Sequence, residues 1–228
     1  MREKYLEEDA LLLVEQNFYF LQTGAFFTTL SKEYNLSHSC NLQIIKEFDK
    51  AQVYRFNENI IRQVLENAKE SSKEETILFE YFVEMNAFRG ICMAMVEALK
   101  LERGFKHFLQ EKLAHQFDSF VDIISFVRNV LSHNIHADIY LDEKDYEGTL
   151  KRILRCRRDP NVHFDFLYSR DLEEIQSPAP EYGFKCTINF QNLNNNTPFL
   201  EVISLWELMM LSELCFNLVI AYRLSKTS

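Results

Sequence analysis

Three polar residues near the middle of the chain, Arg128, Asn129 and His133, are of types that can act on a phosphodiester. An arginine is a permanent cation whose guanidinium binds phosphate, and a histidine can accept or donate a proton near neutral pH. Together these side chains could carry out RNA chemistry without a metal ion. Whether they do so depends on the elements that position them.

The segment that carries these residues is predicted to be a helix over 117–133, because its apolar residues recur three or four positions apart. Five helical residues correspond to a rise of about 7.5 Å and a rotation of about 140°, so Arg128 and His133 do not lie on one line. If the helix ends near His133, the long arginine side chain can bend toward the imidazole. Asn129 lies four residues before His133 and could hydrogen-bond to it or orient it.

The rest of the chain predicts a mainly α protein with a small inserted β-hairpin region. Five glycines and four prolines in 228 residues are too few for an all-β protein, which needs many tight turns. Apolar periodicity predicts the elements. Helices are expected over about 3–30, 42–69, 74–101, 105–115, 117–133, 145–156 and 198–224, and strands over 162–168 and 184–190.

We therefore predict a single domain over 1–228, with a bundle of four to five helices formed by about 1–134 and 198–224. The two strands are expected to pair antiparallel within an α/β insertion at about 138–196. Thr197 is the expected N-cap of the last helix, with Pro198 at its first position.

The pattern Arg128-Asn129-x-x-x-His133 resembles the signature of the HEPN superfamily, the higher eukaryote and prokaryote nucleotide-binding domains. That signature is an arginine, a polar residue and a histidine at a total gap of four to six residues, near a helix end in an α-helical bundle. The resemblance implies a metal-independent endoribonuclease without a cofactor, working as a homodimer whose two motifs form one cleft. Such proteins occur in toxin–antitoxin pairs, in phage defence and among CRISPR-associated nucleases.

The resemblance also implies a role for each motif residue. Arg128 would stabilise the negative charge that grows on the phosphate in the transition state. His133 would act as general base on the 2′-hydroxyl or as general acid on the leaving oxygen, and Asn129 would orient a side chain or the phosphate. RNA would be cut and DNA spared, because the chemistry needs a 2′-hydroxyl, and the product would carry a 2′,3′-cyclic phosphate.

A structural explanation of the same residues competes with this hypothesis. Arg128 and Asn129 could be surface residues, and His133 could cap the helix C-terminus, where a positive ring is favourable. The chain would then be a non-catalytic module that dimerises or binds a protein partner such as an antitoxin.

Two further patterns point to other chemistry and are weaker. The segment Arg158-Asp-Pro-Asn-Val-His163 repeats the Arg-x4-His spacing, but its proline forbids a continuous helix. His133, His136 and Asp138 could contact a metal ion, yet no sequence cluster supplies the remaining ligands. We therefore predict no metal site.

The densest basic run of the chain comprises Lys151, Arg152, Arg155, Arg157 and Arg158. It could hold an RNA backbone near the motif, although a solvated helix face is the more common explanation of such a run.

Other polar residues are expected close to the motif. Asp118 and Asp122 share the polar side of the motif helix and could bind the motif arginine at rest. Glu84, Asn86 and Arg89 lie on the helix expected beside it, and one of them could face the cleft.

The formal net charge of −9 means that RNA would have to bind through a local patch, against the overall field. The five cysteines are scattered and contain no CxxC pair, which favours buried or inert thiols in a reducing compartment. The N-terminal residues are not those of a signal peptide. The apolar stretch 199–224 is interrupted by charged residues and is expected to be a buried helix rather than a membrane span. We therefore expect a cytoplasmic protein.

Overall fold

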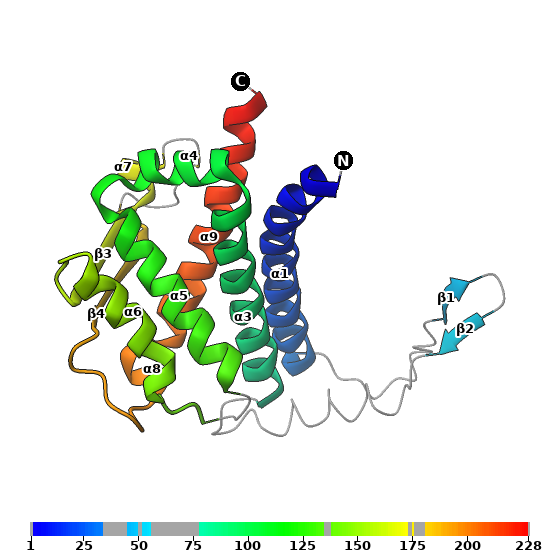
Figure 1. Ribbon diagram of the computed structural model, residues 1–228. Helices are drawn as coiled ribbons and strands as arrows, with labels where there is room; N and C mark the ends of the chain where they lie inside the picture. The colour runs from blue at the N-terminus through cyan, green and yellow to red at the C-terminus, as the bar shows by residue number, and fades with distance from the viewer. Residues whose placement is uncertain are drawn as a thin grey trace. The chain divides into compact units, whose positions relative to one another are not determined.

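The computed structural model describes residues 2–33, 45–49, 52–55, 78–134, 138–172, 175 and 181–227 (Figure 1). These residues form long helices and two small antiparallel sheets, which confirms the predicted mainly α class. The chain divides into two compact units: residues 21–84 form one, and residues 1–20 together with 85–228 form the other.

The long helices lie close to the predicted ranges, with two exceptions given below. They are α1 (Arg2–Glu33), α3 (Leu78–Leu101), α4 (Arg103–Leu113), α5 (Phe117–His133), α6 (Glu143–Arg155) and α9 (Leu205–Thr227), accompanied by the short α7 (Tyr168–Asp171) and α8 (Phe199–Val202). The motif helix α5 has the predicted bounds. Because Asn134 follows in extended backbone, His133 is the last helical residue.

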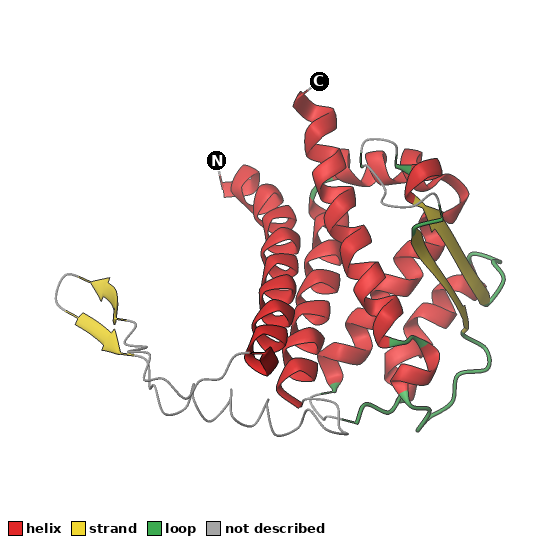
Figure 2. Ribbon diagram, turned by 180° about the vertical axis from the view of Figure 1, so that it is seen from behind, coloured by secondary structure: helices red, strands yellow, loops and turns green. Residues whose placement is uncertain are grey.

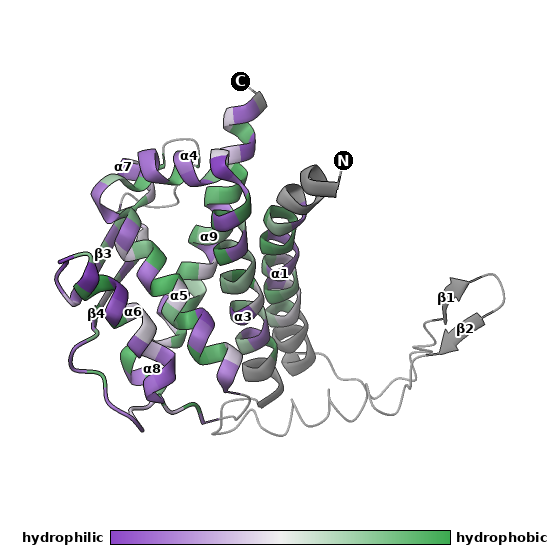
Figure 3. Ribbon diagram, viewed as in Figure 1, coloured by the Kyte–Doolittle hydropathy of each residue, from purple (hydrophilic) through white to green (hydrophobic). Residues whose placement is uncertain are grey.

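Helix α5 runs through the core of the larger unit. Its side chains from 123 to 127 are all buried. Phe120 packs on Phe164 with ring centroids 5.8 Å apart, and Phe126 meets Phe190 edge to face at 5.4 Å. Each fully buried phenylalanine contributes about 1.5–3 kcal/mol, so α5 is anchored along its length. Figure 3 shows the contrast with α6, whose residues are largely hydrophilic.

The insertion contains the predicted antiparallel pair (Figure 2), formed by β3 (Asn161–Leu167) and β4 (Gly183–Asn189) in unbroken register. Strand β3 packs on α5, and β4 packs on α9. The side chain of Gln116, just before α5, pairs with β3 as a strand would. Its oxygen accepts the Asp165 backbone N–H at 2.6 Å, and its amide donates to the Asp165 carbonyl at 2.8 Å.

The helix predicted over 42–69 is wrong for the part that the structure describes. A hairpin stands there, in which β1 (Ile45–Asp49) pairs antiparallel with β2 (Gln52–Arg55). Apolar residues over so short a stretch fit a helical and a strand period equally well, and Val53 and Tyr54 are of types that favour strands. The remaining positions of that prediction lie outside the described residues.

The last predicted helix is broken in two. Helix α8 ends at Val202, Ile203 is extended, and α9 begins at Leu205. Ser204 and Glu207 form a capping box: the Ser204 N–H donates to the Glu207 carboxylate at 2.7 Å, and the Glu207 N–H donates to the serine hydroxyl at 3.2 Å. These reciprocal bonds favour a new helix start at this point.

Thr197 is not the N-cap that its sequence position suggests. Pro198 takes the N-cap position of α8, in extended backbone, and pairs with Tyr140 in an isolated β-bridge. The Thr197 carbonyl accepts the Leu141 N–H at 2.9 Å. These contacts keep the backbone extended up to Phe199, where α8 starts.

Within the described residues, Leu205–Lys226 is long and apolar enough to cross a membrane by length and composition. Half of its apolar window is buried inside the structure, including Leu208, Leu211 and Leu214. Such a helix is weak evidence for a membrane span, because a core helix passes the same test.

We expect Gly183→Ala to destabilise the protein by about 1–3 kcal/mol. A Cβ at Gly183 would lie 1.9 Å from the carbonyl oxygen of Phe166, so β3 and β4 would have to separate. The control is Gly148→Ala on α6, where an added Cβ meets no atom within 4 Å. There the alanine should stabilise the helix by about 0.5–1 kcal/mol. Urea unfolding measures both variants, and equal midpoints would contradict this packing.

Candidate functional site

His133 stands at the end of α5 with one ring nitrogen against a buried carboxylate. Its Nδ1 lies 3.0 Å from Oδ1 of Asp145, a residue in the first turn of α6. The Asp145 side chain is fully buried, whereas 43% of the His133 side chain is exposed. The imidazole is therefore held on one side and open to solvent on another.

Asp145 also joins α5, α6 and the segment between them. Its second carboxylate oxygen accepts the backbone N–H of Asp142 at 2.9 Å and the side-chain amide of Asn134 at 3.5 Å. Its backbone carbonyl accepts the side-chain amide of Asn129 at 3.3 Å. Asn129 thus acts on His133 through α6, by holding the residue that the imidazole contacts.

Arg89, a residue of α3, donates hydrogen bonds to backbone carbonyls at the C-terminal end of α5. The Arg89 Nε donates to the Leu131 carbonyl, and its Nη2 donates to the Asn134 carbonyl at 3.1 Å. The Asn134 side chain adds a bond to the Val130 carbonyl at 2.8 Å. Carbonyls at a helix end otherwise lack intrahelical partners. Arg89, one of the polar residues expected near the motif, therefore caps the helix that carries His133.

Arg128 leaves α5 toward α3. Its side chain is half-buried, and its positive charge acts on the buried thiol of Cys92. Burial raises the pKa of Cys92 to about 12, and the Arg128 charge only partly opposes that rise. The Arg128 Nε is buried without a hydrogen-bond partner. No carboxylate among the residues that the structure describes forms an ion pair with this guanidinium.

Arg128 and His133 therefore leave α5 on different sides. Arg128 lies toward α3 and His133 contacts α6, as a rotation of about 140° over five residues requires. In the described part of the chain, no hydrogen bond or ion pair joins the two side chains. A phosphate bound by both would have to lie across the C-terminal end of α5.

Two arginines of the basic run belong to a buried cluster. The Arg152 Nε lies 3.0 Å from Oδ1 of Asp122, and the Arg158 Nη2 lies 2.6 Å from Oδ2 of the same residue. Asp122 is fully buried, so these guanidiniums neutralise a charge that could not stand alone in the core. The sequence offered Asp122 as a partner for Arg128, and the structure pairs it with Arg152 and Arg158 instead.

The other residues of the basic run lie on the surface. Lys151 forms an exposed ion pair with Glu147, one turn earlier on α6, and such pairs contribute little. Arg155 and Arg157 are exposed and have no carboxylate partner in the described ranges. These two arginines are the members of the run that are best placed to meet an RNA backbone.

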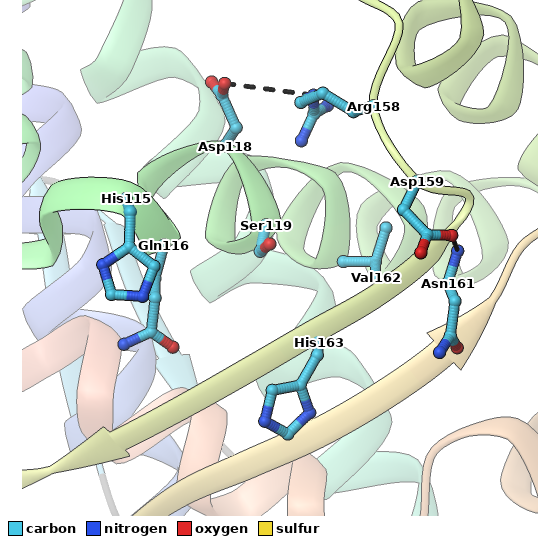
Figure 4. A pocket seen from close by; sticks show the side chains of 9 residues that line it. All are labelled: His115, Gln116, Asp118, Ser119, Arg158, Asp159, Asn161, Val162 and His163. Atoms are coloured by element: carbon cyan, nitrogen blue, oxygen red, sulfur yellow. Dashed lines mark hydrogen bonds and ion pairs between the residues drawn. The ribbon is translucent and has the colours of Figure 1, made fainter.

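A separate pocket of about 340 Å³ lies near the opposite end of α5 (Figure 4). It is lined by His115, Gln116, Asp118, Ser119, Arg158, Asp159, Asn161, Val162 and His163. Arg158 and His163, the second pair with Arg-x4-His spacing, therefore line the same pocket. Arg158 lies in a loop and His163 on β3, rather than both on a helix.

The charges of this pocket are unfavourable for a phosphate. Arg158 is already bound to Asp122, and its Nε lies 3.9 Å from Asp118 (Figure 4). Asp118 and Asp159 both stand at the pocket wall, where their negative charges repel an anion. His163 is engaged through Nδ1, 2.8 Å from the Thr187 hydroxyl. The α5 motif remains the better candidate for RNA chemistry.

The described residues contain no metal-binding cluster, and their buried thiols are not suited to nucleophilic chemistry. No group of three or more His, Cys, Asp or Glu side chains among them is arranged to hold a metal ion. His136, considered with His133 as a ligand, lies outside the described residues. Burial raises the pKa of Cys92 and of Cys186 to about 12 each, so neither is a thiolate nucleophile at neutral pH.

Comparison of the chain with family models, with curated proteins and with solved structures finds no match. A functional proposal therefore depends on the residues and on their geometry.

We expect Asp122→Asn to lower the free energy of unfolding by about 3 kcal/mol, because it leaves the partly buried Arg152 without a carboxylate and Arg158 with only Asp118, 3.9 Å away. The matched control on the same helix is Asp118→Asn, whose side chain is 65% exposed. That change should stay within about 0.5 kcal/mol. Urea unfolding compares the two variants. An Asp122→Asn protein as stable as the wild type would contradict the buried cluster.

Proposed function

We propose that this chain is a metal-independent endoribonuclease of the HEPN type, with Arg128, Asn129 and His133 as its motif residues. The observation that carries the proposal is Arg128 itself, a half-buried guanidinium without an anionic partner among the described residues. Arg152 and Arg158 are matched by Asp122. A partly desolvated, unmatched guanidinium favours an anion, and its planar donors suit a phosphate.

His133 supplies the proton transfer in this proposal. Its imidazole takes the proton of the ribose 2′-hydroxyl, and the oxygen attacks the adjacent phosphorus. The bond from phosphorus to the 5′-oxygen breaks, and that oxygen takes a proton from water or from a second imidazole. Arg128 stabilises the negative charge that develops on the phosphate. The products are a 2′,3′-cyclic phosphate and a 5′-hydroxyl, and the reaction needs no cofactor.

The proposal includes a homodimer with two motifs in one cleft. Because Arg128 and His133 leave α5 on different sides, two copies could present an arginine and a histidine to one phosphate more readily than one copy could. We propose that a ribonuclease of this kind acts as a toxin that an antitoxin inhibits, or as a component of phage defence.

The alternative function is a non-catalytic module for dimerisation or partner binding. Arg128 and His133 point to different sides of α5, so one copy alone would not bind a single phosphate with both side chains. This arrangement favours the non-catalytic module. The two proposals differ in whether the motif side chains are needed for RNA cleavage.

We expect the protein to cleave single-stranded RNA in the presence of EDTA and to leave DNA of the same sequence intact. His133→Ala and Arg128→Ala should each slow cleavage about 100-fold or more, because they remove the proton acceptor and the phosphate ligand. Gel analysis of end-labelled RNA, with detection of the 2′,3′-cyclic phosphate, measures the effect.

The matched controls for this assay lie on the surface of α4. His107→Ala and Arg103→Ala remove exposed side chains of the same two types and should keep the wild-type rate. Cleavage that survives both motif substitutions would rule out the assignment. A folded wild-type protein that binds a partner but cuts no RNA would favour the non-catalytic module.

We further expect Arg155→Gln and Arg157→Gln to weaken RNA binding without a large loss of stability, because both side chains are exposed. Each substitution that removes one phosphate interaction should reduce the slope of log K against log salt by about 0.7. Fluorescence anisotropy measures this in a His133→Ala background, which prevents cleavage. Lys100→Gln, on an exposed lysine paired with Glu97, is the control. An unchanged slope would place the RNA elsewhere.

A further inference from the structure

We propose that Asp145 is a positioning residue, whose carboxylate keeps the proton of the neutral His133 ring on Nδ1 and leaves Nε2 as the proton acceptor. The catalytic consequence rests on the proposed ribonuclease function, whereas the location of the proton can be tested without it. The sequence motif alone contains no partner of this kind for the histidine.

The contact between Asp145 and His133 determines which ring nitrogen of the neutral imidazole carries the proton. The Oδ1 atom of Asp145 lies 3.0 Å from Nδ1 of His133. An ionised carboxylate only accepts hydrogen bonds, so the nitrogen that faces it must donate. In a neutral imidazole the other nitrogen then has a free lone pair. For His133 that nitrogen is Nε2, on a side chain that is 43% exposed.

The surroundings of Asp145 strengthen its role as an acceptor. Its second oxygen already receives the Asp142 N–H at 2.9 Å and lies 3.5 Å from the Asn134 amide nitrogen. Both groups are donors, so the carboxylate plane is fixed by the helix start and by the segment after α5. Because Asp145 is fully buried, water does not readily replace a missing partner. The orientation of the imidazole is therefore set before any RNA binds.

A purely structural role for Asp145 makes a different prediction. Its bond to the Asp142 N–H also closes the first turn of α6, so any substitution could lower stability. Asp145→Asn separates the two roles because its shape is unchanged. The amide oxygen can keep the Asp142 N–H, which turns the amide NH2 toward Nδ1 of His133. Nδ1 must then accept, and the proton of the neutral ring moves to Nε2.

The test is the protonation pattern of His133 in the free protein, followed by RNA cleavage. Long-range 1H–15N correlation spectra, assigned with His133→Gln, report which ring nitrogen carries the proton. We expect the proton on Nδ1 in the wild type and on Nε2 in Asp145→Asn. Cleavage by Asp145→Asn should fall about 100-fold or more, because Nε2 no longer accepts a proton. Asp118→Asn, the same substitution on a side chain of α5 that is 65% exposed, should change neither the spectrum nor the rate.

The outcomes separate this proposal from the proposed function. A wild-type proton on Nε2 would overturn the role of Asp145, whether or not RNA is cut. Wild-type cleavage by an Asp145→Asn protein with a switched proton would overturn its catalytic consequence. A wild type with the proton on Nδ1 that cuts no RNA would end the ribonuclease proposal and leave the positioning by Asp145 standing. If Asp145→Asn does not fold, the wild-type spectrum alone decides the tautomer.

Discussion

Two fully buried carboxylates hold α5 and α6 together, and the candidate site depends on both. Asp122, near the start of α5, binds an arginine of α6 and another from the loop after it. Asp145, near the start of α6, binds His133 at the end of α5. The contacts lie at opposite ends of an antiparallel helix pair, so together they fix its register. Removing the partner of a fully buried carboxylate leaves an uncompensated charge, so each contact resists a slip of the helices.

The same cluster shapes the electrostatics of the protein. The chain carries a net charge of −9, and Asp122 neutralises two of the arginines in its densest basic run. Of the motif and the basic run, Arg128 is half-buried, and Arg155 and Arg157 are exposed without a carboxylate partner among the described residues. If the protein is the ribonuclease proposed above, such a surface restricts where RNA can bind, because the net negative charge repels a polyanion.

The elements with a regular pattern could be predicted from the sequence, including the seven-residue strands β3 and β4, whereas the shorter hairpin β1–β2 and the break before α9 could not. Helix α5 has the expected bounds because apolar spacing of three and four residues over 17 positions has one interpretation. The hairpin β1–β2 was mistaken for a helix because four or five residues do not distinguish the two periods. The break before α9 was missed although Ser204-x-x-Glu207 carries a capping signal, since the apolar residues on both sides continue one helical period.

The site was predictable only in part, for a physical reason. The sequence placed Arg128 on the right helix and His133 at its end, because both positions follow from local spacing. What each side chain faces depends on which helices pack beside α5. Asp145 lies twelve residues after His133 and reaches it only through the packing of α6 on α5. Arg89 reaches the same helix end from α3, and no local pattern specifies either contact.

The cap that Arg89 and Asn134 place on α5 has a consequence for motion. Helix ends usually fray, so a side chain on the last turn spends part of its time on an unwound backbone. Here the carbonyls of Val130, Leu131 and Asn134 are bonded to side-chain donors. Local opening of this turn must break those bonds, which should slow amide hydrogen exchange there relative to an uncapped end. The imidazole of His133 is thus carried by a helix terminus that stays wound.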